Sequence, residues 1–438
     1  GKALITCAEQ WAKEIGGKDG VFEANVGGTQ FIFFCSWEAA KPVYDARPYK
    51  VGRSSLFQRF VDELPGVFTA EGPRWRRQRQ LVVPAFHNRV ISNYVPAVKT
   101  IVGKFVQHLK ALSSDPQTSK VNVSQLLPRL TSSILISTLT GEMVEAFTEA
   151  SLAHAPVAAH VDRWFTAIVT RMLAPCEYWT WPIVGSWFPH CQDFKRMTSL
   201  ITELIDKAFA KGTNGTTLLD KLAEAHDGDK FTKEELIGNV LTLFAAGTDT
   251  TSSSLMWTFY ELSHQPELQM ELAREVQEVL PNGWESLEDL EKLTLAKAVW
   301  WESLRLHAPV PWLALTNNVE IEVAGKTLPP GMMCAMLNRY IINTSKEMLA
   351  LGSDVDVWRP QRWLDGAGGL HKVSMLDLAF GQGARTCLGK SLAHLEGLAI
   401  IAEVSRNCKI GKAMNPVHEV MNFTAAAEPD LVLCMEGK

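Results

Sequence analysis

The chain has 438 residues, of which 46% are hydrophobic and 21% are charged, a balance typical of a globular protein that buries a sizeable core. Its formal net charge of −5 and its pI near 6.2 argue against a nucleic-acid-binding protein. The eight cysteines are scattered without a C-x-x-C pair, which disfavours a disulfide framework or a zinc site, and no apolar run reaches the roughly 18 residues that a membrane span needs.

In chain order, the residue pattern predicts a short helix over residues 4–16 and a β-hairpin over about 21–35, where β-branched and aromatic residues are frequent. From about 75 to 280, apolar residues recur at three- and four-residue spacing, which predicts helices. A second β patch covers about 313–337 and contains turns marked by Pro and Gly. We therefore expect a mainly α fold with a small β portion, formed by residues 1–438 as a single domain.

A basic cluster begins a predicted helix at residues 72–79. Trp75 and Arg79 lie one turn apart on one face of this helix. Left to itself, such a cluster is more often a solvated helix face or a patch for an anionic partner, and Arg76 and Arg77 fit that description.

Residues 164–165 and 178–189 are rich in tryptophan. The prolines and the glycine of the second stretch exclude a helix through it. One interpretation is core packing. The other is contact with a membrane surface, because a loop does not easily bury so much aromatic surface and tryptophan suits the depth of a membrane interface.

The run Phe-Ala-Ala-Gly-Thr-Asp-Thr-Thr at residues 244–251 lies inside a long predicted helix, about 234 to 264. It is poor helix sequence, because glycine costs about 1 kcal/mol against alanine and threonine side chains can bond back to the preceding turn. One interpretation is a close helix crossing at Gly247 followed by solvated threonines. The other is a widened turn that makes room for a small ligand.

Glu302 and Arg305 lie three residues apart on one predicted helix face. Exposed pairs of this kind contribute little to stability. The neighbouring residues 298–301 are apolar, however, so we expect the pair to be buried and to need further partners. Arg362, in the later run Pro-Gln-Arg-Trp at residues 360–363, is the candidate third member.

Residues 380–389 follow the pattern F-x-x-G-x-R-x-C-x-G, in which each fixed position meets a need of a thiolate that binds haem iron. Cys387 supplies the sulfur. The glycines, Gly381 and Gly389 among them, let backbone N–H groups approach it closely. A helix that begins directly after the cysteine points its positive end at the sulfur, which we expect to lower the pKa of the thiol.

In the same run, Arg385 can reach a haem propionate as a charged donor, and Phe380 supplies an apolar cover that keeps water off the sulfur. A small buried cysteine at a helix start is the alternative reading of Cys387. The run resembles the haem-binding loop of the cytochrome P450 family. The four stretches described before it resemble further motifs of that family, in the family's order, over nearly the whole chain.

The resemblance implies a haem held between the long central helix and the cysteine loop. Thr250 would donate a hydrogen bond to the oxygen undergoing reduction, and Asp249 would relay protons from solvent, because O–O cleavage consumes two protons. Glu302, Arg305 and Arg362 would brace the cysteine loop.

The resemblance also assigns Trp75 and Arg79 to the haem propionates, beside Arg385. Many members of the family carry a further Arg or His where this chain has Leu315, so propionate binding would rest more heavily on the other three residues. A second departure is Trp363, where the family usually has Phe.

By resemblance, the chain is a haem b-dependent monooxygenase that inserts one oxygen atom from dioxygen into an apolar C–H bond. No flavin or nicotinamide fingerprint occurs in the chain, so NADPH would act only through a separate partner, NADPH-cytochrome P450 reductase or a ferredoxin. Two alternatives stay open. One is a haem-thiolate isomerase or dehydratase acting on a lipid peroxide, and the other is a haem sensor or carrier without turnover.

Candidate pocket segments are residues 53–67, 244–246 and 311–316, which are largely apolar, with Phe57 and Phe60 in the first. We therefore expect a small apolar substrate, a lipid such as a sterol or a fatty acid. The resemblance to eukaryotic membrane-associated members implies membrane-surface contact at the cytoplasmic face of the endoplasmic reticulum, with a mitochondrial or a soluble bacterial protein as alternatives. Because the chain opens without an initiator methionine, we also expect that an N-terminal anchor is absent from it.

Overall fold

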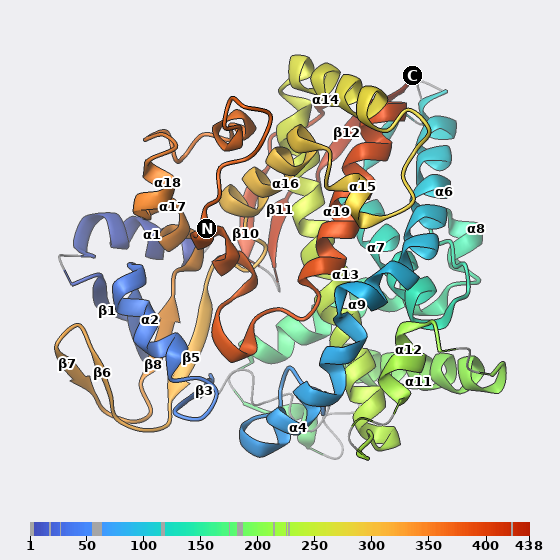
Figure 1. The fold of residues 1–438 in the computed structure, drawn as a ribbon. Coiled ribbons are helices and arrows are strands. Elements are labelled where there is room, and N and C mark those ends of the chain that lie inside the picture. Colours follow the sequence, from blue (N-terminus) through green and yellow to red (C-terminus); the bar gives the residue numbers. More distant parts are fainter. Residues whose placement is uncertain are drawn as a thin grey trace.

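Helices make up most of the chain, and strands gather near its two ends and around residues 313–336 in the computed structural model (Figure 1). This confirms the predicted mainly α fold with a small β portion. The structure describes residues 4–16, 19–26, 28–54, 64–114, 119–174, 176–181, 187–212, 215–224, 226, 228–421 and 424–438.

The largest sheet has five strands in the order β1-β2-β8-β5-β3. Their bounds are β1 (Val21–Val26), β2 (Thr29–Phe34), β3 (Val51–Arg53), β5 (Leu313–Asn317) and β8 (Met333–Met336). Strands β2 and β8 run parallel, and the other neighbours run antiparallel. The two predicted β patches thus join in one sheet, which buries an apolar cluster on each face.

Shorter strands form three further sheets. Strands β6 (Ile321–Val323) and β7 (Lys326–Leu328) make a hairpin inside the second predicted patch. The sequence did not predict the sheet β4-β12-β9 or the pair β10-β11. Their bounds are β4 (Lys120–Asn122), β9 (Cys408–Ala413), β10 (His418–Met421), β11 (Ala425–Glu428) and β12 (Val432–Gly437). Pairing between segments far apart in the chain, rather than local propensity, forms these strands.

The helices before the central one are α1 (Leu4–Ile15), α2 (Trp37–Asp45), α4 (Gly72–Val82), α5 (Asn88–Ile91), α6 (Val95–Ser113), α7 (Val123–Thr140), α8 (Glu149–Leu152), α9 (Pro156–Leu173), α11 (Pro189–Ala210) and α12 (Leu218–Ala223). Those after it are α14 (Pro266–Val279), α15 (Leu287–Leu290), α16 (Thr294–Leu306), α17 (Asn338–Thr344), α18 (Lys346–Leu349) and α19 (Lys390–Asn407).

The stretch that was predicted as helical over 75–280 consists of several helices with clear local boundaries. Gly141 ends α7 in the left-handed conformation, with φ of +75°. Pro156, Pro189 and Pro266 each stand at the first helical position of a new helix, where the missing N–H costs nothing.

The central helix is α13 (Lys233–Ser263), which confirms the long helix predicted over about 234–264 (Figure 1). Thr232 and Glu235 form a capping box that fixes its start. The helix packs against α7, α11, α16 and α19, so its middle turns lie deep in the helical part of the molecule. The helix α19 follows the cysteine loop and is buried over most of its length, which anchors that loop to the core.

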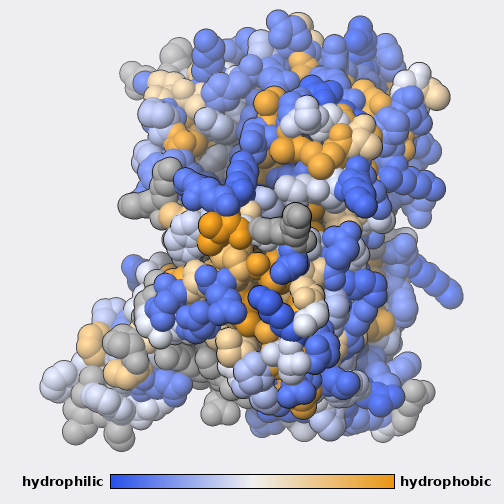
Figure 2. Space-filling model, turned by 90° about the vertical axis from the view of Figure 1, so that its left-hand side faces the viewer, coloured by the Kyte–Doolittle hydropathy of each residue, from blue (hydrophilic) through white to orange (hydrophobic). Residues whose placement is uncertain are grey.

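Figure 2 shows the sheet side of the molecule, where apolar atoms gather in the middle of the face between hydrophilic side chains. Among the residues that the structure describes, no helix combines the length and the apolar character needed to cross a membrane.

Candidate functional site

The loop that carries Cys387 is fixed by its own backbone. The Cys387 N–H donates to the Phe380 carbonyl oxygen (N···O 2.8 Å), and the Thr386 hydroxyl donates to the Gly381 carbonyl oxygen (2.8 Å). Gly381 and Gly383 have φ of +76° and +72°, in the left-handed region that favours glycine. The glycines of the motif therefore serve the turn that places the sulfur just ahead of α19.

Opposing influences act on the Cys387 thiol. Burial among protein atoms raises its pKa, whereas the Gly389 backbone N–H and the cations Arg79 and Lys390 lower it. The Gly389 N–H at the helix start thus acts in the predicted direction, but the net pKa is raised, because desolvation outweighs the favourable charges there. Cys387 as a residue is nonetheless exposed.

Phe380 joins the cysteine loop to the helices behind it. The Phe380 ring centroid lies 5.1 Å from that of His394. The Lys390 ammonium nitrogen lies 5.6 Å from the Phe380 ring centroid. The Trp300 indole donates to His394 Nδ1 (2.9 Å), and burial lowers the pKa of His394 to about 4. Phe380 therefore packs on a neutral imidazole at the start of α19.

Trp75, Arg79 and Arg385 converge beside the cysteine loop. Trp75 is buried, and the guanidinium carbon of Arg385 lies 4.7 Å from the centre of its ring. Arg79 Nη1 donates to the carbonyl oxygen of Thr386, the residue before Cys387 (2.9 Å). Three side chains that the sequence grouped by motif alone thus lie together in space.

Arg77, in contrast, is not the solvated cation that the sequence suggested. Its guanidinium donates to the Asp229 carboxylate (2.6 and 3.0 Å), to the Glu235 carboxylate (2.8 and 2.9 Å) and to the Lys230 carbonyl oxygen (2.8 Å). These bonds tie α4 to the start of the central helix.

Two further arginines lie in the same neighbourhood, and the sequence had assigned neither of them to a cofactor. Arg47 and Arg53 are 7% and 9% exposed, and their charges, like that of Arg385, interact with the Glu71 carboxylate. We call these four residues the arginine cluster. Arg385 Nη2 donates to Glu71 Oε2 and to the Ala70 carbonyl oxygen, both at 2.7 Å, whereas Arg385 Nε and Nη1 are buried without a hydrogen-bond partner in the described part of the chain.

Burial and mutual repulsion act on the charges of the arginine cluster. Burial lowers the pKa of Arg53 most, the charges of Arg385 and Arg47 lower it further, and the charge of Glu71 raises it. Burial is also the main cause that lowers the pKa of Arg385 to about 10. No local pattern could have revealed the cluster, because its members come from four separate segments.

Asp249 and Thr250 lie half-buried in the middle of α13. The Thr250 hydroxyl donates to the Ala246 carbonyl oxygen (2.7 Å), which is the bond to the preceding turn that the sequence predicted. Thr131, from α7, donates to the Thr248 carbonyl oxygen (2.9 Å). Side-chain hydroxyls therefore engage two carbonyl groups in this part of the central helix.

Gly247 is not explained by helix packing. A Cβ atom at this position would lie 3.5 Å from the Leu135 side chain, which is an ordinary van der Waals distance. The crossing of α7 and α13 therefore does not require glycine, and this disfavours the interpretation of the motif as a close helix crossing.

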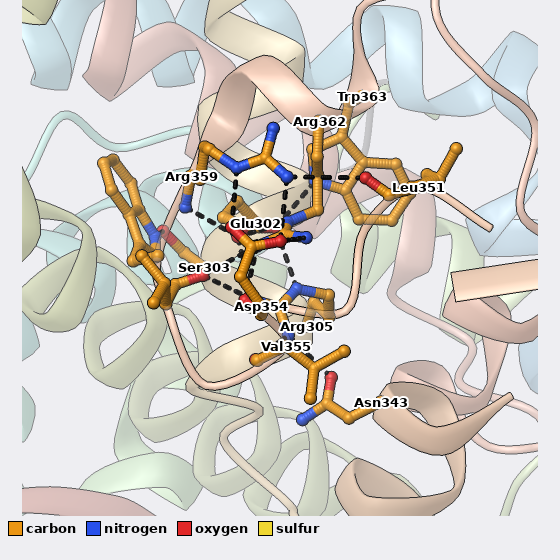
Figure 3. A network of polar contacts seen from close by, with 12 residues as sticks. Glu302, Ser303, Arg305, Asn343, Leu351, Asp354, Val355, Arg359, Arg362 and Trp363 are labelled. Atoms are coloured by element: carbon orange, nitrogen blue, oxygen red, sulfur yellow. Dashed lines mark hydrogen bonds and ion pairs between the residues drawn. The ribbon is translucent and has the colours of Figure 1, made fainter. Parts of the chain in front are cut away.

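Glu302 and Arg305 are fully buried, and Arg305 uses all of its guanidinium N–H groups (Figure 3). Its Nε and Nη2 donate to the Glu302 carboxylate (2.8 and 2.7 Å). Its remaining N–H groups donate to the Asn343 side-chain oxygen (2.8 Å) and to the carbonyl oxygens of Val355 (2.6 Å) and Val357 (3.1 Å). The pair is buried, as predicted, and its charges are satisfied.

Arg362 joins this pair, as the sequence predicted, and Nε of Arg362 donates to Glu302 at 3.0 Å (Figure 3). Arg362 Nη1 donates to Asp354 (3.1 Å). The Trp363 indole also donates to the Glu302 carboxylate (2.9 Å), as does the Arg359 backbone N–H (2.8 Å). Phenylalanine at position 363 would lack this donor, so the departure from the usual motif adds a hydrogen bond to the buried carboxylate.

The tryptophan-rich segments divide into a buried and an exposed part. Trp164, in α9, is fully buried, which fits core packing. Trp181, Trp187 and Phe188 are 54%, 75% and 41% exposed, which does not fit it. The run 182–186 between them lies outside the described residues.

Of the candidate pocket segments, the part on α13 is described in full: Phe244 and Ala245 are buried beside the half-buried Ala246. Trp312 and Leu313 are half-buried at the start of β5. Phe57 and Phe60 lie outside the described residues.

Comparison with known proteins shows the family of this chain. The family model described as Cytochrome P450 matches residues 12–429. "Cytochrome P450 CYP72A613" of Trigonella foenum-graecum is 24% identical over 368 residues, which cover 81% of this chain and 68% of the relative. "25-hydroxyvitamin D-1 alpha hydroxylase, mitochondrial" of Homo sapiens is 27% identical over 360 residues, which cover 77% of this chain and 68% of the relative. The solved structure "Crystal structure of cytochrome P450DA heme domain" has the same fold, with a TM-score of 0.82, 20% identity and coverage of 100% of this chain and 93% of that one. The chain therefore belongs to the cytochrome P450 family and is a haem-dependent monooxygenase of that family.

Proposed function

We propose that Cys387 is the thiolate ligand of the haem iron, and that Trp75, Arg79 and Arg385 hold the haem propionates. The observation that carries this proposal is a buried cation beside an exposed cysteine: Arg385 keeps Nε and Nη1 without hydrogen-bond partners in the described part of the chain. A carboxylate is the natural acceptor for such donors. Gly381 and Gly389 also fit a cofactor site, because no protein atom lies within 4 Å of where a Cβ would stand at either residue.

When bound, haem supplies the activation of dioxygen. The protein's own residues would manage protons and water around it. Thr250 would hold a proton at its hydroxyl in the middle of α13, and Asp249, one residue before it, would pass protons on from solvent. Their half-buried positions support this division of roles, because the pair lies between the protein interior and its surface.

The substrate we propose is a sterol-like lipid. Support comes from the apolar side chains Phe244, Ala245 and Leu313 in the candidate pocket segments. The human relative is named as a hydroxylase of 25-hydroxyvitamin D. A titration of the holoenzyme with sterols, fatty acids and azoles, followed by the low- to high-spin shift of the haem spectrum, tests this class; a shift with fatty acids alone would contradict it.

Electrons would come from a separate protein, either NADPH-cytochrome P450 reductase or a ferredoxin. The absence of a flavin or nicotinamide fingerprint from the sequence supports this. Reconstitution with each donor in turn, with product measured for each, distinguishes the two.

Contact with a membrane surface would involve the exposed aromatic side chains Trp181, Trp187 and Phe188. The human relative is named as mitochondrial, so the membrane concerned need not be that of the endoplasmic reticulum. Replacing Trp181 and Trp187 together by Ala should reduce sedimentation of the protein with lipid vesicles. Met270→Ala, at an exposed apolar residue on α14, is the matched control; equal binding by all variants would contradict the proposal.

The ligand assignment is tested by spectroscopy of the reduced protein with carbon monoxide. Thiolate ligation gives a strongly red-shifted Soret band. Cys387→Ala should lose this band, and Cys408→Ala, at a buried cysteine on β9, should keep it. A wild-type spectrum typical of histidine ligation would contradict the assignment.

Proton delivery is tested by the yield of product per NADPH oxidised. Thr250→Ala should still bind haem and substrate but release much of the reducing power as hydrogen peroxide, because acid–base steps of this kind are worth about 10²- to 10⁴-fold. Asp249→Asn should slow turnover with less uncoupling. If Thr250→Ala stays fully coupled, the proposed role of Thr250 in proton delivery is contradicted.

A further inference from the structure

Two carboxylate groups face the imidazole of His307, the residue that follows α16. His307 Nε2 lies 2.7 Å from Glu261 Oε1, in the last turn of α13. On the other side of the ring, His307 Nδ1 lies 3.9 Å from Glu419 Oε2, on β10. A neutral imidazole can donate from only one of its nitrogens, whereas the imidazolium donates from both. The two contacts together therefore fit the charged form of His307.

The charged groups behind these contacts join two further helices to the same place. Arg339, at the start of α17, donates to both Glu419 carboxylate oxygens (2.7 Å each) and to the Glu9 carboxylate of α1 (2.8 and 2.9 Å). Burial favours the neutral form of His307, but Glu261 and Glu419 outweigh it and raise the pKa of His307 above its usual 6.5. The His307 side chain is 14% exposed, so it can exchange a proton with solvent.

The same contacts lead to the stretch of α13 that follows Thr250. The His307 ring stacks on the Trp257 indole, with centroids 4.6 Å apart and ring planes 6° apart. Trp257 Nε1 (3.0 Å) and Ser253 Oγ (2.6 Å) both donate to the Ala425 carbonyl oxygen, at the start of β11. Strand β11 pairs with β10 in antiparallel orientation. His307 thus contacts the central helix and the β10-β11 pair at once.

An ion pair that only stabilises the fold is the simpler explanation of these contacts. An arginine would serve that purpose at every pH, as Arg339 does beside it. A histidine changes its charge near neutral pH, and only one of its two nitrogens can still donate when the proton leaves. The residue type at position 307 therefore points to a contact that changes with pH.

We propose that His307 is a pH-dependent positioning residue, which as an imidazolium fixes the β10-β11 pair against the part of α13 directly after Asp249 and Thr250. When the proton leaves, one carboxylate faces a nitrogen lone pair, and the strand pair loosens from the helix. Because the pKa of His307 is higher in the folded state than the unfolded value of 6.5, this fixation is fully present below pH 6.5. It is lost as pH rises through the folded-state pKa.

The consequence for the reaction is a pH-dependent yield of product per NADPH oxidised, since groups that deliver protons act only when they are held in place. This consequence rests on the proposed roles of Asp249 and Thr250, whereas the contacts of His307 do not.

Hydrogen–deuterium exchange of the β10 and β11 amides in the holoenzyme, corrected for the intrinsic exchange rate, measures the fixation between about pH 6 and 9. In wild type, exchange should become about tenfold faster across the titration, the size expected for the loss of one charge-assisted hydrogen bond. His307→Gln, which stays neutral, should exchange fast throughout, and His307→Lys, which stays charged, should exchange slowly throughout. Glu261→Gln should move the step to lower pH, because it removes a carboxylate that favours the proton.

His418→Gln is the matched control. His418 also lies on β10 beside a carboxylate, with Nε2 3.6 Å from Glu428 Oε2, but these side chains are 64% and 65% exposed. Exposed pairs contribute little, so the step should stay as in wild type. A flat profile in wild type would overturn the inference, as would a step that persists in His307→Gln or disappears in His418→Gln.

The yield of product per NADPH oxidised, measured over the same pH range, tests the consequence for the reaction. The ratio of this yield in His307→Lys to that in wild type should rise with pH, with the midpoint of the exchange step. A ratio that does not change with pH would overturn the link between His307 and the reaction.

Far-UV circular dichroism monitors the fold of each variant. If His307→Gln does not fold, His307→Lys and Glu261→Gln decide: loss of the step in the first and its shift in the second support the inference, and an unchanged step in either overturns it. A wild-type protein without the thiolate band in the presence of carbon monoxide defeats the proposed ligand Cys387 and leaves the exchange result standing.

Discussion

Two buried groups of arginines in this protein are built in opposite ways. In the network around Glu302, Arg305 places each of its N–H groups on an acceptor, and the Glu302 carboxylate receives bonds from Arg305, Arg362 and Trp363. In the arginine cluster, Arg385 forms two bonds through Nη2 and leaves Nε and Nη1 unpaired within the described residues.

The difference separates a structural from a functional use of buried charge. Desolvated ions stabilise a fold only when their partners are already present, as they are around Glu302. A site that must receive an anionic cofactor needs the opposite, cations held ready with donors unused. The two groups should therefore respond differently to the same kind of substitution.

The largest expected effect is on folding, from Arg305→Leu. This change leaves the Glu302 carboxylate buried with fewer counter-charges, which should lower the free energy of unfolding by about 3–5 kcal/mol. The measurement is urea unfolding followed by far-UV circular dichroism. Arg385→Leu is the matched change in the arginine cluster and should cost about 1 kcal/mol or less in the same assay while haem release becomes faster. Equal losses of stability in the two variants would erase the distinction.

A second test uses a buried carboxyl group that forms no ion pair with the described residues. Glu396, on α19, is 4% exposed, its Oε2 has no hydrogen-bond partner in the described part of the chain, and burial raises its pKa from 4.5 to about 8. The folded state therefore holds a proton that the unfolded state loses above pH 4.5. This group's contribution to stability is fully present below that pH, is lost as pH rises, and is gone above about pH 8.

Glu396→Gln should remove this pH dependence. At pH 8 the variant should be more stable than wild type by about 4 kcal/mol, and the difference should shrink toward pH 5. Urea unfolding of both proteins across this range gives the difference curve. A flat difference curve would show that the Glu396 carboxyl group does not titrate between the folded and unfolded states as described.

The smallest effect sharpens the comparison within the Glu302 network itself. Trp363→Phe removes the indole donor to the carboxylate and should lower the free energy of unfolding by about 1.5–3 kcal/mol, the range for a hydrogen bond to a charged group. Trp358→Phe is the matched control, because its indole donates to the neutral Ser303 hydroxyl (3.2 Å) and should cost about 0.5–1.5 kcal/mol. A larger loss in the control would mean that packing, rather than the charge of the acceptor, dominates.

Local sequence was sufficient where a feature depends on neighbours along the chain. The long helix around Asp249 and Thr250 has a capped start and apolar spacing, and its predicted bounds differ from the observed ones by a single residue at each end. The turn before Cys387 needs glycine at φ above +70°, and the spacing of the motif records that need. The pair Glu302 and Arg305 lies one helical turn apart, so its geometry follows from the helix.

Only the tertiary structure decided features that depend on distant segments. The strands β9 and β12 pair with each other and β4 pairs with β12, although none has a strong pattern of its own. The net pKa of Cys387 follows from how densely protein surrounds the sulfur, which the helix start alone does not reveal.

The amino-acid sequence by itself determined the cysteine loop, the central helix and the membership of the cytochrome P450 family. Each of these depends on residues that are close together, or in a fixed order, along the chain. The place of Arg53 was decided by the fold, because Arg53 faces Leu315 across two paired strands, and its backbone N–H and the Arg385 guanidinium both donate to the half-buried Glu71 carboxylate. Register and desolvation are properties of the folded chain, and no local pattern encodes either of them.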